Sequence, residues 1–492
     1  MPSPATHSAA VRCVMLLVLV LSSIVLAACH TPFTDEDIRG LIQRGEFTRA
    51  DAAIAVRLAL DTSLTPTARQ ALAFERERLA RIRLDFRGNE QEVRNFILRW
   101  IPSAQDADLR RWEESGALEM MIIDGRKCYF NSAARNLFRI DSAARAIWQE
   151  KHQQEPPAMG LASDSGLDAH CAAIMAAVRT TGRRSVLPHR IEITYTIRVN
   201  PGAVPAGEVV RCWLPFPREI PGRQESVTLL GTDPQVSILA DTSRLQRTVY
   251  LERPAVADSA TVFTVRYAYT SFGVYQPIDP ARVGRVAPGA DLEPFLREEP
   301  PHIRFTPALR ALNAEIVGQE TNPVLIARKL FAWCDRHIPW ASAREYSTIP
   351  SLSAYAFENR HGDCGIQTTF FITLLRMNGI PARWQSGWEF RPPTDSMHDW
   401  GMVYFAPYGW VPMDVTYGPR RSDDPSLRFF YLSGMDGYRL IFNDATGEPF
   451  YPAKVHPRSE LLDSQRGEVE WRGGNLYFDQ WDYEFRYQIA DI

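Results

Sequence analysis

Two neighbouring stretches decide the central fold: residues 359–390 read NRHGDCGIQTTFFITLLRMNGIPARWQSGWEF, and residues 397–418 read MHDWGMVYFAPYGWVPMDVTYG. In the first, a tight Gly-flanked turn containing Cys364 leads into an apolar helical pattern, which Gly379 and Pro381 bring to an end. Three short runs then alternate between apolar and polar side chains (ARWQSGWEF, MHDWGMVYFA and GWVPMDVT), which is typical of strands. The pattern predicts one helix followed by a β-meander.

Cys364 lies at the start of the predicted helix, where unpaired N–H groups and the helix dipole favour a thiolate. His398 and Asp414 belong to the second and third predicted strands, so a meander can bring them side by side. A thiol needs a base within about 3 Å, and the base needs a carboxylate that holds its tautomer. We therefore predict a catalytic triad of Cys364 as nucleophile, His398 as base and Asp414 as orienting acid.

Three neighbouring residues offer alternatives to this assignment. His361 is a rival base, provided that the turn folds it back over the thiol of Cys364. Asp399 directly follows His398, but adjacent residues of a strand face opposite ways, so Asp399 is not expected to orient the imidazole. Asp414 could instead be a turn residue.

An oxyanion hole at this site would use the backbone N–H of Cys364 and one further donor. Trp340, Tyr346 and Gln367 qualify for the second position by residue type only. The four tryptophans in and beside the predicted strands are expected first of all to form the core and rim of the sheet.

The motifs GDC at a helix start, HDW on a strand and YGWVPMDVT resemble the transglutaminase-like superfamily, whose bacterial members commonly carry G-x-C, H-x-W and G-W-x-x-x-D. The resemblance covers residues 300–420 and implies a papain-like α+β core with Cys364, His398 and Asp414 in the roles given above. The chain departs from the family pattern at Asp399, where many relatives carry a small residue, and in the residues that follow the Cys.

Changes of periodicity divide the rest of the chain. Helical spacing and good helix formers precede a series of short strand-like runs, which begins with IEITYTIRVN, and a Pro- and Gly-rich linker separates these runs from the helix-rich start of the motif region. The predicted fold class is α+β. Its domains are a helical domain over residues 29–182, an antiparallel β-sandwich over 186–275, the catalytic domain over 300–420 and a β-rich C-terminal extension over 421–492.

The first residues resemble an export signal. Residues 14–26 form a 13-residue apolar run, shorter than the ~20 residues of a membrane-spanning helix but typical of a secretory signal. Leu26-Ala27-Ala28-Cys29 resembles the lipobox of bacterial lipoproteins. This resemblance implies a signal peptide over residues 1–28 and a lipid on Cys29, with the body anchored to a membrane in the periplasm or at the cell surface. An ordinary cleaved signal and an uncleaved anchor are the alternatives.

Composition and cysteine spacing exclude several classes of protein. The 492 residues carry a formal net charge of -3, which argues against a nucleic-acid binder. Of 7 Cys, Cys13 would leave with the signal, and the remainder show neither a disulfide framework nor CxxC metal knuckles. Cys212 and Cys334 are expected in the core. We predict no cofactor and no metal site.

The predicted triad would attack an amide or ester carbonyl and form a thioester. Transfer of the acyl group to water makes the enzyme a peptidase or amidase, which we favour, and transfer to an amine makes it a cross-linking protein-glutamine acyltransferase. A non-catalytic surface module that binds a partner is the alternative from another class. The expected substrate is a peptide or protein, with the cell envelope as one source.

Overall fold

The computed structural model describes residues 33–152, 165–235, 237–286, 289, 291–391 and 394–492. The predicted signal peptide and Cys29 therefore lie outside the described residues. The chain divides into two compact units, one comprising residues up to Phe86 together with Met121–Cys128, and the other comprising Arg87–Met120 and Tyr129–Ile492.

The first unit is a helical bundle with most of a β-hairpin. Its helices are α2 (Asp35–Gln43), α3 (Phe47–Leu60) and α4 (Pro66–Asp85), and the hairpin strands are β1 (Met120–Ile123) and β2 (Arg126–Tyr129). The Thr-Pro pair at the start of α4 acts as a helix start: the Thr65 hydroxyl accepts from the backbone N–H of Ala68, and Pro66 occupies the first turn.

The second unit begins with the remaining helices of the N-terminal region, which are α5 (Glu90–Trp100), α6 (Asp106–Glu114), α7 (Ala133–Ile140), α8 (Ser142–His152) and α9 (Ser165–Thr181). The helical character predicted for this region is confirmed. Its helices nevertheless belong to both units, and α9 packs its apolar face into the same core as the motif region. None of the helices within the described ranges is both long and apolar enough to cross a membrane.

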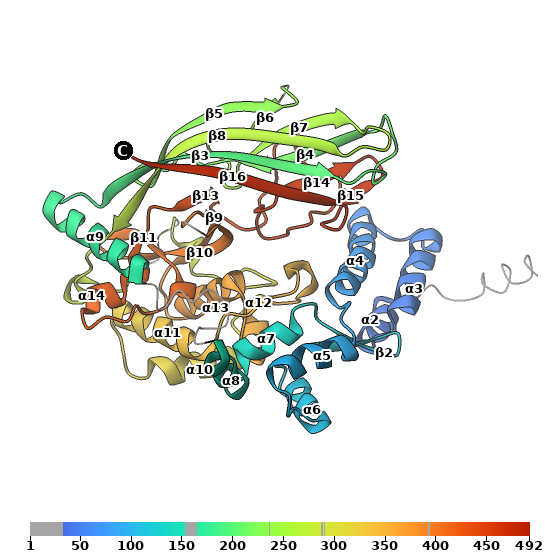
Figure 1. Ribbon diagram of the computed structural model, residues 1–492, viewed down its shortest axis with the longest axis horizontal. Helices are drawn as coiled ribbons and strands as arrows, with labels where there is room; N and C mark the ends of the chain where they lie inside the picture. Colours follow the sequence, from blue (N-terminus) through green and yellow to red (C-terminus); the bar gives the residue numbers. More distant parts are fainter. Residues whose placement is uncertain (1–32, 153–164, 236, 287–288, 290, 392–393) are drawn as a thin grey trace, which may run out of the picture. The chain divides into compact units, whose positions relative to one another are not determined.

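Two five-stranded antiparallel sheets form a β-sandwich in the second unit. The order of the first is β12-β8-β3-β16 with β5 paired to β8, and that of the second is β15-β14-β4-β7-β6. Figure 1 shows β5, β8, β3 and β16 as long ribbons side by side. Their bounds are β3 (Ser185–Val199), β4 (Val209–Pro215), β5 (Gln224–Asp233), β6 (Ser237–Leu239), β7 (Thr248–Pro254), β8 (Thr261–Tyr275), β12 (Gly434–Met435), β14 (Glu468–Trp471), β15 (Gly474–Leu476) and β16 (Trp481–Asp491).

Alternation along the strands builds the sandwich core. In β3, Ile191, Ile193, Tyr195 and Ile197 point inward and are fully buried, and they join the inward residues of the second sheet in one cluster. Thr194 between them pairs with Arg266 across to β8. The antiparallel sandwich predicted from the short strand runs is therefore present.

The motif region folds as predicted, with one helix and a meander. Helix α13 (Cys364–Met377) is followed by β9 (Ala382–Glu389), β10 (Ser396–Phe405) and β11 (Gly409–Met413), and β13 (Arg439–Asn443) completes a sheet of order β11-β10-β9-β13. The accompanying helices are α10 (Pro307–Val317), α11 (Pro323–His337), α12 (Leu352–Asn359) and α14 (Pro425–Arg428), with 3₁₀ turns η2 (Pro280–Arg282), η3 (Glu293–Phe295), η4 (Tyr346–Thr348), η5 (Val415–Tyr417) and η6 (Phe430–Leu432).

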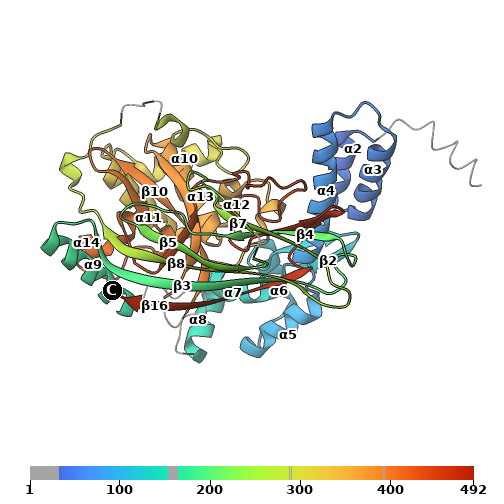
Figure 2. The same cartoon turned by 90° about the horizontal axis from the view of Figure 1, so that it is seen from above.

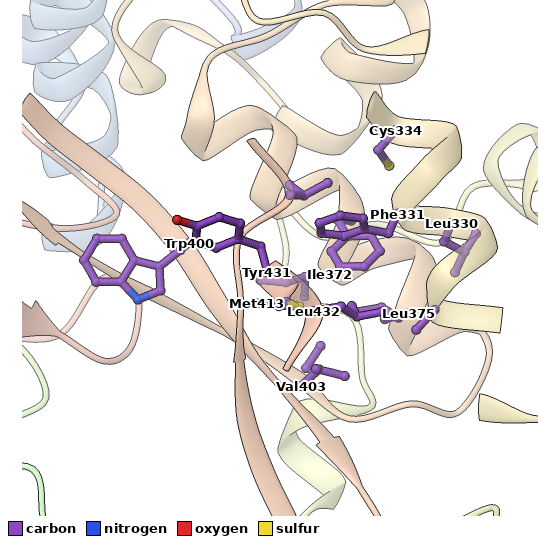
Figure 3. Packing of buried hydrophobic residues seen from close by; sticks show 14 of the residues in the cluster. Leu330, Phe331, Cys334, Ile372, Leu375, Trp400, Val403, Met413, Tyr431 and Leu432 are labelled. Carbon is purple, nitrogen blue, oxygen red and sulfur yellow. The ribbon is translucent and has the colours of Figure 1, made fainter. Parts of the chain in front are cut away.

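Helix α13 packs against β9 and β10 of this sheet, and α11 packs on α13. Figure 3 shows Phe331 and Cys334 of α11, Ile372 of α13 and Val403 of β10 within one packed cluster. Cys334 is 2% exposed, in agreement with its expected place in the core. Viewed from above in Figure 2, α10, α11 and α13 gather beside β10. The mixture of helices and antiparallel sheets confirms the α+β class.

The C-terminal segment does not stand apart, contrary to the division made from the sequence. Within residues 421–492, β13 joins the sheet of the motif region, β12 and β16 join the first sandwich sheet, and β14 and β15 join the second. Strand-like runs in the sequence show that strands form but not which distant strand they pair with, because backbone pairing is non-local.

Candidate active site

Cys364 occupies the first turn of α13. The carboxylate of Asp363 caps this helix, since its Oδ1 accepts from the backbone N–H of Ile366 at 3.1 Å. A Cβ at Gly365 would lie 2.0 Å from the hydroxyl of Tyr346 and 2.7 Å from Asp399 Oδ2, so only glycine allows these groups to approach the helix start. Cys364 itself remains partly exposed.

The thiol of Cys364 contacts a carboxyl group. Its S–H donates to Asp399 Oδ2 over 3.4 Å. The Tyr346 hydroxyl lies 2.8 Å from Asp363 Oδ1 and 3.3 Å from Asp399 Oδ2. Burial, followed by the charges of Asp399 and Asp363, raises the pKa of the Cys364 thiol well above its usual range. The thiol is therefore held as S–H in this arrangement.

Asp399 belongs to a buried group of acids. Its Oδ1 accepts from Gln465 Nε2 at 2.6 Å, and its carboxyl group is hydrogen-bonded to that of Asp463. Burial, together with Asp463 and Asp363, raises the pKa of Asp399 well above the ordinary value. Burial also raises the pKa of Asp363 to about 6. This side of the strand thus concentrates like charges beside the sulfur.

His398 and Asp414 form a buried pair. His398 Nε2 lies 2.8 Å from Asp414 Oδ2, and both side chains are 0% exposed. Asp414 Oδ1 accepts from the backbone N–H of Thr416 at 3.2 Å, so Asp414 also caps the turn that follows β11. His398 Nδ1 is buried and has no hydrogen-bond partner among the described residues. One imidazole nitrogen is therefore held by a carboxylate and the other is left for a further group.

Arg439 of β13 lies behind this pair. Its Nη1 is 3.0 Å from Asp414 Oδ2 and 3.4 Å from Glu389 Oε2, and its Nη2 is 2.9 Å from Asp436 Oδ2. The guanidinium group packs between the rings of Trp400 and Tyr417, 5.2 Å and 4.8 Å from their centroids. Arg439 thus places one positive charge among three buried carboxylates.

The structure brings together His398 and Asp414 but does not join the thiol to them. Within the described chain no hydrogen bond links Cys364 Sγ to His398, and the partner of the thiol is Asp399. As the strand alternation predicts, Asp399 faces away from the His398–Asp414 pair. The contact between Asp399 and the sulfur was not predicted. The alternation of side chains along β10 does not show which of its two faces lies next to the start of α13.

The rival base and the candidate oxyanion donors differ in their partners. His361 is buried edge-on to the Tyr355 ring, and burial lowers the pKa of His361 to about 4. The Tyr346 hydroxyl donates to Asp363 Oδ1, and Gln367 Nε2 donates to the carbonyl of Ile338 at 2.7 Å. The buried indole N–H of Trp340 finds no acceptor in the part of the chain that the structure describes.

Asp463 and Gln465 were missed by sequence reasoning. They lie on the segment that leads into β14, and two buried glutamates of β14 hold that segment in place. Glu468 accepts from the backbone N–H groups of Ser459 and Glu460, each at 2.8 Å. The alternating run EVEW predicts a strand but carries no signal that points to Asp399.

Comparisons with known proteins agree with the motif region. Residues 310–415 match the model of the transglutaminase-like superfamily. The Bacillus subtilis protein YebA, which is described as uncharacterized, is 30% identical over 93 residues, covering 15% of this chain and 13% of YebA. The chain therefore matches a small part of that relative's length.

Two solved structures match parts of this chain at low sequence identity. A candidate cysteine protease from Cytophaga hutchinsonii is 17% identical with a TM-score of 0.41, over 63% of this chain and 92% of that one. The periplasmic domain of TgpA from Pseudomonas aeruginosa is 17% identical with a TM-score of 0.25, over 49% of this chain and 91% of that one.

Proposed function

We propose that this chain, which carries a transglutaminase-like domain over residues 310–415, is an exported thiol enzyme that acts on an amide or peptide bond. The observation that carries the proposal is the buried His398–Asp414 pair, whose imidazole keeps one nitrogen without a partner among the described residues. Cys364 at the start of α13 supplies the nucleophile in the same domain.

In the proposed reaction, His398 Nδ1 takes the thiol proton of Cys364. The Cys364 thiolate attacks the carbonyl carbon, and the backbone N–H of Cys364 and the indole N–H of Trp340 stabilise the oxyanion. The C–N bond breaks as His398 returns the proton to the leaving amine. Water then hydrolyses the thioester, and Asp414 keeps the imidazole in position throughout.

The proposal includes hydrolysis in preference to acyl transfer, a peptide or protein substrate of the cell envelope, and a lipid anchor on Cys29. The export signal in the sequence supports the location. No cofactor is required for this chemistry.

Thiol labelling tests the triad directly. Iodoacetamide labelling of Cys364 against pH, located by mass spectrometry, is compared between the unmodified protein, His398→Ala and the matched control His361→Ala. We expect His398→Ala to slow labelling near neutral pH by about tenfold or more and His361→Ala to leave it unchanged. The buried thiols of Cys171, Cys212 and Cys334 serve as internal references. Equal labelling in both variants would rule out His398 as the base.

Product analysis separates hydrolysis from transfer. A peptide pool is incubated with the protein and a fluorescent primary amine, with Cys364→Ala as the control. New carboxyl termini without amine incorporation support a hydrolase, and amine incorporation at glutamine would instead identify an acyltransferase. Absence of either product above the Cys364→Ala background would favour the binding module.

The lipid anchor has a separate test. Cells that express the full chain are grown with a labelled fatty acid, and the protein is compared with Cys29→Ser. Label on the unmodified protein alone supports lipidation of Cys29. Label on neither protein would contradict it.

A further inference from the structure

The atom that is to react, Cys364 Sγ, has a carboxyl group as its polar side-chain contact. Asp399 Oδ2 lies 3.4 Å from the sulfur, and the backbone N–H of Asp399 also points to it. Asp399 is 3% exposed and is fixed from the other side by Gln465 Nε2 at 2.6 Å. The carboxyl group is therefore built into the thiol's surroundings.

Asp399 is in contact with a second acid. Its carboxyl group is hydrogen-bonded to that of Asp463, which Ser386 Oγ holds by a 2.8 Å bond to Oδ2. Two carboxylates in contact cannot both ionise without strong repulsion, so such a pair keeps one proton between them. In the structure Asp399 is the donor to Asp463, so this proton lies on Asp399, next to the sulfur, and reaches the sulfur only by turning from Asp463.

The remaining charged groups around Asp399 come from three elements. The start of α13 supplies Cys364 and Asp363, and the turn η4 supplies Tyr346. The segment before β14 supplies Asp463, whose own surroundings include Arg458 and Arg466. Glu460 on the same segment adds a further acid, whose charge interacts with Asp463. The two arginines face Asp463, so no cation is in contact with Asp399 itself among the described residues.

We propose that Asp399 is a further catalytic residue, whose carboxyl O–H donates to the Cys364 thiolate and whose carboxylate, once the proton is lost, holds the thiol as S–H and prevents attack. This inference rests on the proposed role of Cys364 as nucleophile. The proton balance is simple: the S–H proton passes to His398, and Asp399 keeps its own proton while the thiolate attacks. No other reactant is needed.

The Asp399–Asp463 pair makes the reactivity of the Cys364 thiol depend on pH. Burial, Asp463 and Asp363 raise the pKa of Asp399, so the protonated, donating form extends above the range of an ordinary aspartic acid. As pH rises through the pKa of Asp399, its carboxyl group ionises, and the negative charge disfavours the Cys364 thiolate. The enzyme is therefore expected to work on the acid side of its own Asp399 ionisation.

Two substitutions should move thiol reactivity in opposite directions. Asp399→Asn keeps a donor and never ionises, so iodoacetamide labelling of Cys364 at pH 8 should be about tenfold or more faster than in the unmodified protein. Asp463→Asn removes the neighbouring charge, lets Asp399 ionise at lower pH and should slow labelling near neutral pH. The exposed Asp395→Asn is the matched control and should label like the unmodified protein.

A general loss of structure would change the labelling rate of Cys364 in the same direction in Asp399→Asn and Asp463→Asn. Changes in opposite directions therefore cannot come from it. Equal rates for Asp399→Asn and the unmodified protein at pH 8 would overturn the proposal. Slower labelling in Asp399→Asn at every pH would also overturn it and make Asp399 a base. The outcome is independent of His398→Ala: loss of the His398 effect defeats the proposed triad, whereas the Asp399 and Asp463 shifts report on the acid pair alone.

Discussion

The two faces of strand β10 differ in how charged side chains are arranged on them. On the face of His398, the cation Arg439 lies among Asp414, Glu389 and Asp436. On the face of Asp399, acids meet one another beside the thiol. The carboxylates of the first arrangement share a cation, whereas the acids of the second have no cation between them, and burial together with their repulsion raises the pKa of Asp399. Adjacent residues of one strand thus belong to two different electrostatic environments.

The largest effect is expected from Arg439→Met, which removes the cation of the His398 face. Three buried carboxylates then lose their common partner, and we expect a loss of about 3–5 kcal/mol in the free energy of unfolding, measured by chemical denaturation. Arg266→Met, at an exposed position of β8, removes an arginine that is 53% exposed and should cost about 0.5 kcal/mol or less. A loss under about 1 kcal/mol in Arg439→Met would show that the charges on this face are not mutually dependent.

A smaller test on the same face is Tyr417→Phe. The Tyr417 hydroxyl donates to Glu389 Oε2 at 2.6 Å, and its removal leaves a buried carboxylate short of a donor. We expect a loss of about 1.5–3 kcal/mol in the free energy of unfolding. The control is Tyr404→Phe, whose hydroxyl makes no hydrogen bond within the described residues. Equal stability of the two variants would contradict the importance of this bond.

On the Asp399 face, Gly365→Ala tests how closely the acids approach the helix start. The new methyl group would overlap the Tyr346 hydroxyl and Asp399 Oδ2. We expect a loss of about 1–3 kcal/mol by thermal or chemical denaturation, together with altered labelling of Cys364. Gly231→Ala, where a Cβ meets no atom within 4 Å, is the control. An undisturbed Gly365→Ala protein would mean that the acids can move apart freely.

The smallest expected effect is the pH dependence of stability in Asp463→Asn. The folded-state pKa of Asp399 and of Asp463 lies above the unfolded value of 3.8, so the folded state binds more protons and stability falls as pH rises through the raised values. Removing one acid should therefore stabilise the protein by about 1 kcal/mol at pH 8 and have little effect at pH 4. Urea denaturation at both pH values measures this, and an equal change at the two would refute the coupling.

Local sequence patterns were sufficient for much of the fold. Gly379 with Pro381 predicted a helix end, and the alternating runs predicted the meander. These features depend on capping, backbone preference and two-residue periodicity, which act over a few neighbouring residues. The transglutaminase-like motifs were read from the same stretch.

These local patterns do not predict which strands pair across long stretches of sequence. Residues 421–492 supply strands to three sheets, and the segment before β14 carries Asp463 and Gln465 to Asp399. The hydrogen-bonding groups of a strand are the same in every residue, so its sequence shows that it will pair but not with which partner. The acids beside the thiol could not be located for the same reason.

The sequence by itself determined the helix start that carries Cys364, the strand that carries His398, the strand that ends just before Asp414, and the opposite facing of His398 and Asp399, because these follow from local backbone geometry. Only the tertiary structure decided that the His398–Asp414 pair is backed by Arg439 and that the thiol meets Asp399. Those contacts depend on how β13, α13 and the segment before β14 pack around one strand, and packing is set by the whole core.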